Sequence, residues 1–325
     1  MFFQTAGIEI NPWIPILVAF GISFFTSMGG VSGAFLILPF QMSFLGYTNP
    51  SVSATNQLYN IVAIPSGVYR YYKEGRMVWP LTWVVIAGTL PGVFIGAIVR
   101  VVYLPNPRQF KLFAAGVLLY IGLRIVKDIL NKKPEQSNKM NSEKHFQNII
   151  KQFRAKSKDS DVSNNSTKPI PIPIVKVTHF NLKRLGYTFY DEQFDMSFWG
   201  IFILSFIVGI VGGIYGIGGG AIIAPFFVTF FVLPVYTVAG AALMGTFITS
   251  VAGVTFYVLI APFFPDITIT PDWHLGFLFG IGGFIGIYLG ARCQKYVSAK
   301  LIKWMLATIV IFTAIKYIVS FFNVQ

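Results

Sequence analysis

The sequence is short of charged residues and contains a single cysteine. Only 11% of its 325 residues are charged, whereas roughly a quarter are charged in an ordinary soluble domain. Since 54% of the residues are hydrophobic, a water-soluble fold of this size could not keep its apolar side chains away from water. A lipid bilayer solvates such side chains directly, so the composition predicts an integral membrane protein. The lone Cys293 excludes an intrachain disulfide.

Motifs for catalysis, metal binding and nucleotide binding are also missing. The histidines, His145, His179 and His274, are far apart and form no metal-ligand motif. There is no nucleophile–base arrangement and no G-x-x-x-x-G-K-S/T phosphate loop, so we expect no enzyme, no ATP-driven pump and no cofactor. No Asp or Glu lies in the middle of an apolar segment, which argues against a carboxylate proton relay. Proton coupling through His274, a tyrosine or the substrate is left open.

The net charge of +13 is better explained by membrane topology than by nucleic-acid binding. Most Lys and Arg residues fall in short loops and one long loop, as topology signals do. We therefore expect no nucleic-acid partner. Arg100, Arg124 and Arg292 lie near the ends of apolar segments, where we expect their side chains to reach the membrane surface.

Ten apolar segments predict an all-α integral membrane protein. Most are near the length that crosses a bilayer, whereas the first two are short. The N-terminus lacks the basic region of a cleaved signal peptide, so we expect it to be part of the mature protein. The segments cover approximately 12–28, 34–47, 51–72, 78–103 and 109–130 in the first half, and 197–214, 218–233, 236–261, 273–297 and 300–322 in the second.

Residues 131–196 form the long hydrophilic segment between these two sets. The Asn- and Ser-rich part, Ser157–Lys168, is typical of disorder, and the alternating prolines of Pro169–Pro173 are incompatible with regular helix. We predict a partly disordered, polar cytoplasmic linker between a first membrane repeat at 1–130 and a second at 197–325. A functional cytosolic module in this segment is the alternative.

The two halves repeat one another. Shifting the sequence by 186 places Gly30–Pro39 on Gly216–Pro225. Glycine at every fourth position lets helices approach closely, so each half is expected to contain a tight helix crossing. After eight extra residues in the second half, a shift of 194 pairs the glycines at 88, 92 and 96 with those at 282, 286 and 290.

The distribution of Lys and Arg favours inverted repeats of about five helical segments each over parallel repeats of four. With five segments, the basic central loop and the Arg70–Arg76 loop lie in the cytoplasm, while the acidic loop with Asp266 and Asp272 lies outside. Arg100 and Arg108 fall outside in either arrangement and do not fit the rule. The sequence therefore predicts two inverted membrane repeats.

Glycine clusters interrupt the first helix pair of each half, at Gly29–Gly33 and Tyr215–Gly220. We expect each pair to form a hairpin of broken helices, and the two breaks to meet near the bilayer midplane. Free backbone N–H groups at the start of a helix carry partial positive charge, so the breaks predict an anion site that needs no buried Lys or Arg. Alternatively, the glycines only permit close helix packing.

The next segment of each half carries polar side chains that are costly to leave unpaired in hydrocarbon. Asn56, Gln57 and Asn60 occur close together in the first half, and hydroxyl side chains align with this region in the second. Such neutral groups suit hydrogen bonding to an oxyanion, and polar contacts between helices are the alternative. The predicted substrate-binding residues are Gly30, Ser32, Gly33, Asn56, Gln57, Asn60, Gly216, Gly218, Gly219, Gly220, Thr246, Thr249 and Ser250.

The duplicated glycine pattern resembles a known transporter family. Gly-Ile-Gly-Gly-Gly at Gly216–Gly220 followed by Pro225, and again Gly30–Pro39, is similar to the TauE/SafE sulfite exporter family, the TSUP membrane permeases. The likeness covers both membrane halves but not residues 131–196. It implies a multi-pass permease of the bacterial inner membrane for sulfur-containing anions such as sulfite, sulfoacetate, other organosulfonates or thiosulfate.

We therefore expect a secondary transporter that moves a small sulfur-containing anion by alternating access of its two halves. A passive anion channel with the same neutral filter is one alternative, and a membrane scaffold organised by the central loop is another. The expected partners are a small anionic substrate and the lipid bilayer. Coupling ion, direction of transport and oligomeric state are left open.

Overall fold

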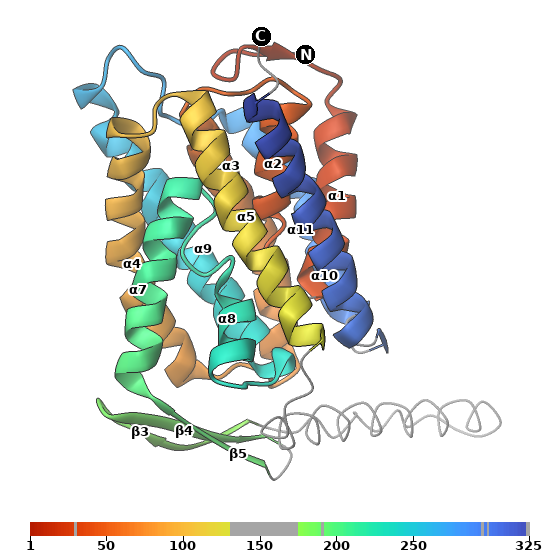
Figure 1. Ribbon diagram of the computed structural model, residues 1–325, viewed down its shortest axis with the longest axis vertical. Coiled ribbons are helices and arrows are strands. Elements are labelled where there is room, and N and C mark those ends of the chain that lie inside the picture. Colours follow the sequence, from red (N-terminus) through yellow and green to blue (C-terminus); the bar gives the residue numbers. More distant parts are fainter. Residues whose placement is uncertain (29–30, 131–174, 190–191, 294–295, 298, 323–325) are drawn as a thin grey trace, which may run out of the picture.

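The computed structural model describes residues 1–28, 31–130, 175–189, 192–293, 296–297 and 299–322 as an elongated helical bundle (Figure 1). In the first half, the elements are β1 (Phe2–Phe3), β2 (Ile8–Glu9), α1 (Trp13–Met28), α2 (Ala34–Ser43), α3 (Ser51–Lys73), α4 (Trp79–Val102) and α5 (Pro107–Leu130). The later elements are β3 (Lys176–Phe180), β4 (Arg184–Phe189), β5 (Glu192–Ser197), α7 (Phe198–Tyr215), α8 (Ile223–Phe230), α9 (Val235–Ile260), the 3-10 turn η2 (Ala261–Phe263), α10 (Trp273–Cys293) and α11 (Ala299–Phe322).

The long helices lie where the apolar segments predict them, with ends shifted by a few residues. The largest shift is at the start of α8, which begins at Ile223 rather than near residue 218. Gly216 and Gly218 have φ angles of 76° and 78°. This left-handed conformation is readily adopted by glycine and ends an α-helix, so the chain turns here before α8 can begin.

The protein is a multi-pass membrane protein. Five of the described helical stretches are long and apolar enough to cross a bilayer, and large apolar side chains such as Trp83, Leu123 and Phe312 are exposed on them or their neighbours. Hydrocarbon solvates such side chains. By contrast, the polar side chains of α3 are buried within the protein. The five stretches are α4, α5 up to Lys127, α7, α9 together with η2, and α10.

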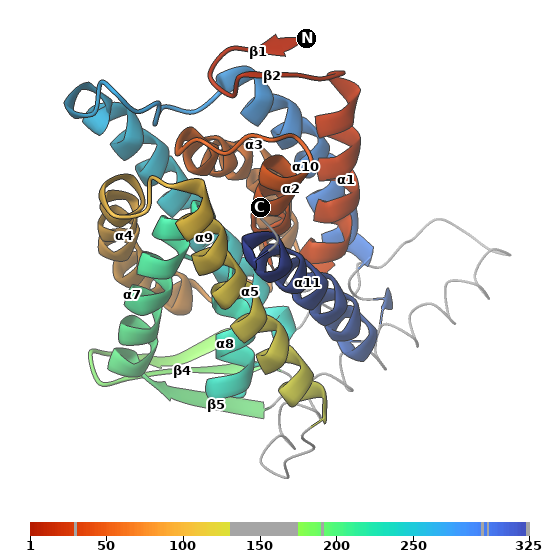
Figure 2. The ribbon, with the colours of Figure 1, turned by 45° about the horizontal axis from the view of Figure 1, so that its top comes forward.

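Helices from the two halves pack extensively against one another (Figure 1 and Figure 2). α4 packs along α7 and α9, and in reciprocal fashion α10 packs along α1 and α3. These contacts define unit A, made of α1, α2, α3 and α10, and unit B, made of α4, α7, α8 and α9. The two units meet where α3 packs on α9, while α5 packs against α11. Each unit therefore contains helices from both halves of the sequence.

The two halves run in opposite directions through the bundle (Figure 1). The first half starts at the end that carries both chain termini and finishes with α5 at the opposite end. The second half starts beside β3–β5 at that opposite end and returns with α11 to the end that carries the termini. Two inverted repeats of five helical segments stay a prediction, which this path of the chain supports.

Glycines bring the paired helices into backbone contact. A Cβ atom built on Gly92 of α4 would lie 2.5 Å from the carbonyl oxygen of Phe206 in α7. A Cβ atom on Gly286 of α10 would lie 2.5 Å from the carbonyl oxygen of Phe20 in α1. Because non-bonded carbon and oxygen atoms do not approach this closely, only glycine fits at either position. The predicted tight crossing is confirmed in both halves, and each crossing joins one half to the other.

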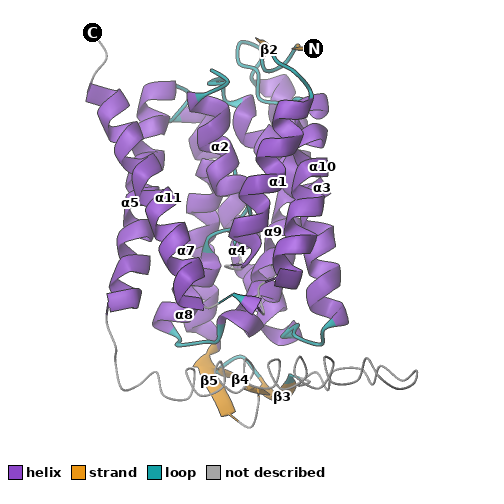
Figure 3. Cartoon of the chain, turned by 90° about the vertical axis from the view of Figure 1, so that its right-hand side faces the viewer, coloured by secondary structure: helices purple, strands orange, loops and turns teal. Residues whose placement is uncertain are grey.

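An antiparallel sheet of β3, β4 and β5 occupies the end of the segment that the sequence analysis interpreted as a linker (Figure 3). On β4, Leu185, Tyr187 and Phe189 are buried. The hydroxyls of Tyr187 and Thr237 of α9 share a hydrogen bond of 2.8 Å, which ties the sheet to unit B. The linker interpretation missed this sheet because its apolar alternation is short and lies among charged residues. The predicted disordered part at 157–168 and the Pro-rich part at 169–173 lie outside the described residues.

The glycine contacts predict a position-specific loss of stability. We expect Gly92→Leu to lower the melting temperature strongly, because the new side chain would overlap the backbone of α7. Overpacking of this kind typically costs about 1–3 kcal/mol, and occasionally more. Gly21→Leu is the control, since no atom lies within 4 Å of a Cβ built there. Thermal unfolding of the purified variants in detergent measures the difference, and equal melting temperatures would contradict the packing.

Candidate functional site

The two broken helices share an equivalent backbone hydrogen bond. After α1, the N–H of Val31 donates to the carbonyl oxygen of Thr26 at 3.2 Å, and after α7 the N–H of Ile217 donates to that of Gly212 at 3.0 Å. The same shift of 186 relates both donors and both acceptors. The α1–α2 and α7–α8 connections are hereafter the first and second hairpins. Each hairpin turns inside the protein, where its backbone groups need partners.

Asn60 of α3 connects both hairpins and α9. Its Nδ2 donates to the carbonyl oxygen of Ile217 at 2.8 Å and to Ser250 Oγ at 3.2 Å. Its Oδ1 accepts a hydrogen bond from Ser32 Oγ in the first hairpin. The side chains of Asn60, Ser250 and Ser32 are fully buried. One carboxamide thus joins unit A to unit B.

Asn56, one turn earlier on α3, makes a second connection between the hairpins. Its Nδ2 donates to the carbonyl oxygens of Ala34 at 2.9 Å and Gly216 at 3.1 Å. Its Oδ1 accepts a hydrogen bond of 3.4 Å from Gln41 Nε2 on α2. Gly216 and Ile217 directly follow α7, so the two asparagines pair carbonyl groups that the break after this helix would otherwise leave unsatisfied.

Helix α9 approaches the second hairpin from the other side. The N–H of Gly219 donates to Thr249 Oγ1 at 3.0 Å, and Thr249 donates in turn to the carbonyl oxygen of Gly245 at 2.7 Å. A Cβ atom on Gly218 would lie 2.7 Å from Ser250 Oγ, and one on Gly220 would lie 2.7 Å from the backbone nitrogen of Thr246. The glycines thus let the hairpin touch α9 directly.

The structure gathers most of the predicted site residues into one buried network. Gln57 is an exception, because its side chain lies against Gly253 of α9 and both of its amide atoms are buried without a hydrogen-bond partner among the described residues. Thr246 Oγ1 donates to the carbonyl oxygen of Ala242, within its own helix. Gly33 adjoins the network through Tyr59, whose hydroxyl would lie 2.6 Å from an added Cβ. Gly30 lies outside the described residues.

Comparison with known proteins identifies the family. A model of the family described as sulfite exporter TauE/SafE matches residues 15–317, nearly the whole chain. The chain belongs to the TauE/SafE family. Members of this family are membrane permeases rather than enzymes, and the protein is accordingly a membrane transporter for a small anion. Neither the curated proteins nor the solved structures that were compared give a match.

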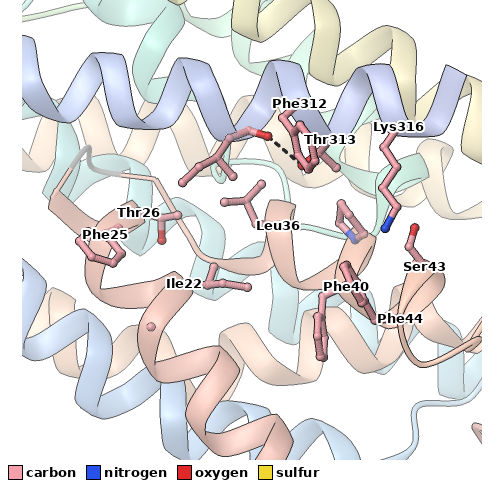
Figure 4. Close-up of a pocket in the computed structure, with 13 residues that line it drawn as sticks. Ile22, Phe25, Thr26, Leu36, Phe40, Ser43, Phe44, Phe312, Thr313 and Lys316 are labelled. Atoms are coloured by element: carbon pink, nitrogen blue, oxygen red, sulfur yellow. Dashed lines mark hydrogen bonds between the residues drawn. The ribbon is translucent and has the colours of Figure 1, made fainter. Parts of the chain in front are cut away.

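Two apolar grooves flank the hairpins of this TauE/SafE protein at positions that the repeat relates. A groove of about 370 Å³ between α1, α2 and α11 is lined in part by Phe40 and Phe44 (Figure 4). A larger groove of about 1000 Å³ between α5, α7 and α8 is lined in part by Phe226 and Phe230, which the shift of 186 aligns with them. Of the predicted site residues that the structure describes, none lines either groove. Their apolar linings suit hydrocarbon rather than a hydrated anion.

The sequence analysis interpreted one charged residue of the TauE/SafE protein wrongly. Arg100 was expected to extend to the membrane surface, yet its side chain is fully buried. Its Nε donates to Ser53 Oγ at 3.4 Å, and Ser53 contacts the turn at Gly216. The segment end suggested a surface position, but Leu104 and Phe110, which follow α4, cover the guanidinium. Both topology models place Arg100 outside, where basic residues are not expected. This misfit was the signal in the sequence that Arg100 differs from an ordinary surface arginine.

Because the second hairpin contacts α9 closely, we predict that alanine costs more stability at Gly218 than at Gly46, although both glycines have similar φ angles. Gly218→Ala and Gly46→Ala both place a side chain at positive φ, 78° and 72°, which costs roughly 1–2 kcal/mol. Only Gly218→Ala also overlaps Ser250 and Thr246, since nothing lies within 4 Å of a Cβ at Gly46. We expect the larger fall in melting temperature for Gly218→Ala. Similar falls for both variants would contradict the hairpin–α9 contact.

Proposed function

We propose that the protein is a secondary transporter that carries a small sulfur-containing oxyanion across the bacterial inner membrane by alternating access. The substrate class covers sulfite, thiosulfate, sulfoacetate and other organosulfonates. The observation that carries the proposal is the network of Asn60, which joins both hairpins and α9 through neutral groups deep in the protein. The family match supports the same function.

The chemistry of this network suits an oxyanion that must be released again. Carboxamide N–H, hydroxyl and backbone N–H groups donate hydrogen bonds without holding the substrate by a fixed opposite charge. In the present state, Asn56 and Asn60 donate to backbone carbonyls. Each such bond contributes roughly 0.5–1.5 kcal/mol net, and a hydrogen bond to a charged group roughly 1.5–3 kcal/mol. An anion can therefore replace these carbonyls when the units separate.

Alternating access in this arrangement opens the contact between α3 and α9. Unit A and unit B meet along these helices, and the bond between Asn60 and Ser250 crosses between them. The glycine crossings of α4 with α7 and of α1 with α10 lie within the units instead. Rocking of unit A against unit B would expose the polar network first to one side of the membrane and then to the other.

The end of the bundle that carries β3–β5 faces the cytoplasm in this proposal (Figure 1). The basic residues 131–196 connect to the bundle at this end. Arg70 and Lys73, in the last turn of α3, also follow a helix that runs toward it. Excess Lys and Arg on the cytoplasmic side is the usual pattern in membrane proteins. Both chain termini then lie outside the inner membrane.

Uptake by reconstituted vesicles tests the proposed function. We expect saturable flux of at least one of sulfite, thiosulfate, sulfoacetate and isethionate, and weaker flux of sulfate, acetate and chloride. Comparison with and without a pH gradient reveals proton coupling. Rapid flux that does not saturate would identify a passive channel. No flux of any sulfur-containing anion by folded protein would contradict the proposal.

Two threonines on α9 give a matched test of the site. Thr249→Val removes the hydroxyl that accepts from Gly219, whereas Thr255 is exposed and, among the described residues, bonds to Val251 of its own helix. Losing a buried hydrogen-bond partner costs about 1–3 kcal/mol, so we expect Thr249→Val to reduce transport at least about fivefold. Thr255→Val should transport like the unmodified protein. Equal flux in both variants, measured in the same vesicles, would remove Thr249 from the site.

A further inference from the structure

Arg100 is a buried cation without a compensating negative charge. It lies in the last turn of α4, and its side chain is among the largest that are fully buried. Among the described residues it forms no ion pair, since the acidic groups that pair are Glu74 and Asp195, each with other partners. Burying an unpaired charge costs several kcal/mol. An arginine kept inside a membrane protein at this cost is by default a functional residue.

The surroundings of Arg100 leave one edge of its guanidinium group available. Nε donates to Ser53 Oγ at 3.4 Å, Nη1 donates to the carbonyl oxygen of Leu104, and Cζ lies 3.9 Å from the centre of the Phe110 ring. Nη2 is buried and has no hydrogen-bond partner in the described structure. Because Phe110 covers a face of the planar group, it does not occupy the donors along the edge.

A second buried group without a partner lies beside Arg100. The buried hydroxyl of Tyr257 on α9 has Ser53 as a hydrogen-bonding neighbour and is near enough to interact with Arg100, but it makes no hydrogen bond of good geometry in the described structure. Tyr257 packs with Ala54 and Val101, the direct neighbours of Ser53 and Arg100 in sequence. Two unsatisfied donors and a serine hydroxyl therefore converge from α4, α9 and α3.

This cluster adjoins the second hairpin and the asparagine network. A Cβ atom on Gly216 would lie 2.5 Å from Ser53 Cα and 2.8 Å from Ser53 Oγ. The carbonyl oxygen of the same Gly216 accepts from Asn56 at 3.1 Å. Ser53 and Asn56 are three residues apart on α3 and so lie on one face of the helix. Ser53 lies in the first turn of α3 and Arg100 in the last turn of α4, and these two helix ends lie toward the end of the bundle that carries the termini (Figure 1).

We propose that Arg100, Ser53 and Tyr257 form a binding subsite for the negatively charged sulfonate or sulfur oxyanion group of the substrate. The inference rests on the proposed transport function and assigns the charge-recognising part of its site. Guanidinium Nη2 and the two hydroxyls offer three donors to an oxyanion, and the anion neutralises the buried cation. The subsite selects anions over neutral molecules of the same shape, a distinction that the neutral asparagine network makes less strongly.

Binding measurements with a charged probe and its neutral analogue test the subsite. Methanesulfonate and dimethyl sulfone have similar shapes and differ in charge, and sulfite and thiosulfate serve as further anions. We expect the purified protein to bind at least one of the three anions in calorimetric titrations and to bind dimethyl sulfone at least tenfold more weakly.

Arg100→Gln should weaken anion binding at least tenfold, and Arg100→Lys, which keeps the charge, by less. Arg292→Gln, at an exposed arginine at the end of α10, should bind like the unmodified protein.

Thermal unfolding separates an anion-binding role from a structural one. If Arg100 binds substrate, removing its unpaired charge leaves the anion-free protein as stable as before or more stable, and abolishes stabilisation by added anion. A fall in the melting temperature of Arg100→Gln with unchanged anion affinity would assign Arg100 a structural role and overturn the proposal. So would the absence of anion binding by the folded, unmodified protein.

Two further outcomes distinguish the subsite from its alternatives. Stabilisation by phosphatidylglycerol that depends on Arg100, without binding of any of the three anions in phosphatidylcholine nanodiscs, would assign the cluster to a lipid phosphate and overturn the proposal. Transport by the unmodified protein with an unchanged KM in Arg100→Gln would overturn the subsite and leave the transport function standing. Arg100-dependent binding without transport would support the subsite and contradict the transport function.

Discussion

A broken helix inside a membrane is possible only if its free backbone groups find partners, and this constraint organises the centre of the protein. Hydrocarbon offers no hydrogen bonds, so each unpaired N–H or carbonyl group costs several kcal/mol. Here Asn56 and Asn60 donate to the carbonyl oxygens of Gly216 and Ile217, while Thr249 accepts from the N–H of Gly219. The amides on α3 donate to the carbonyl groups of the second hairpin, and the hydroxyl on α9 accepts from its N–H group. The second hairpin is therefore held between α3 and α9.

This division of roles distinguishes the two hairpins at aligned positions. The backbone hydrogen bonds of Val31 and Ile217 are equivalent. Yet the first half carries Ser32 where the second half has Gly218, and Ser32 donates to Asn60. Gly218 instead leaves room for Ser250 and Thr246. One hairpin contributes a side chain to the network and the other contributes its backbone, so substitutions at aligned positions are not interchangeable.

Local sequence patterns predicted the helices and the breaks between them, whereas the contacts of individual polar side chains depend on residues that are distant in the sequence. Apolar length fixed the helices, and glycine spacing correctly indicated the close crossings at Gly92 and Gly286, because both signals act within one helix. The sequence favoured Asn56 and Asn60 over Gln57 for substrate contact, and in the structure Gln57 meets Gly253 while Asn60 reaches two hairpins. The burial of Arg100 depends on how the chain folds back after α4, which no pattern within the helix specifies.

The division into units A and B gives the buried charge of Arg100 a place in the transport cycle. Arg100 and Tyr257 belong to unit B, whereas Ser53 belongs to unit A. An anion held by all three groups would link the units at the end of the bundle that carries the termini. A ligand shifts a conformational equilibrium only by its difference in affinity between the states. An anion that contacts all three groups would therefore favour the state in which units A and B bring these groups together, and it would have to lose some of these contacts before release.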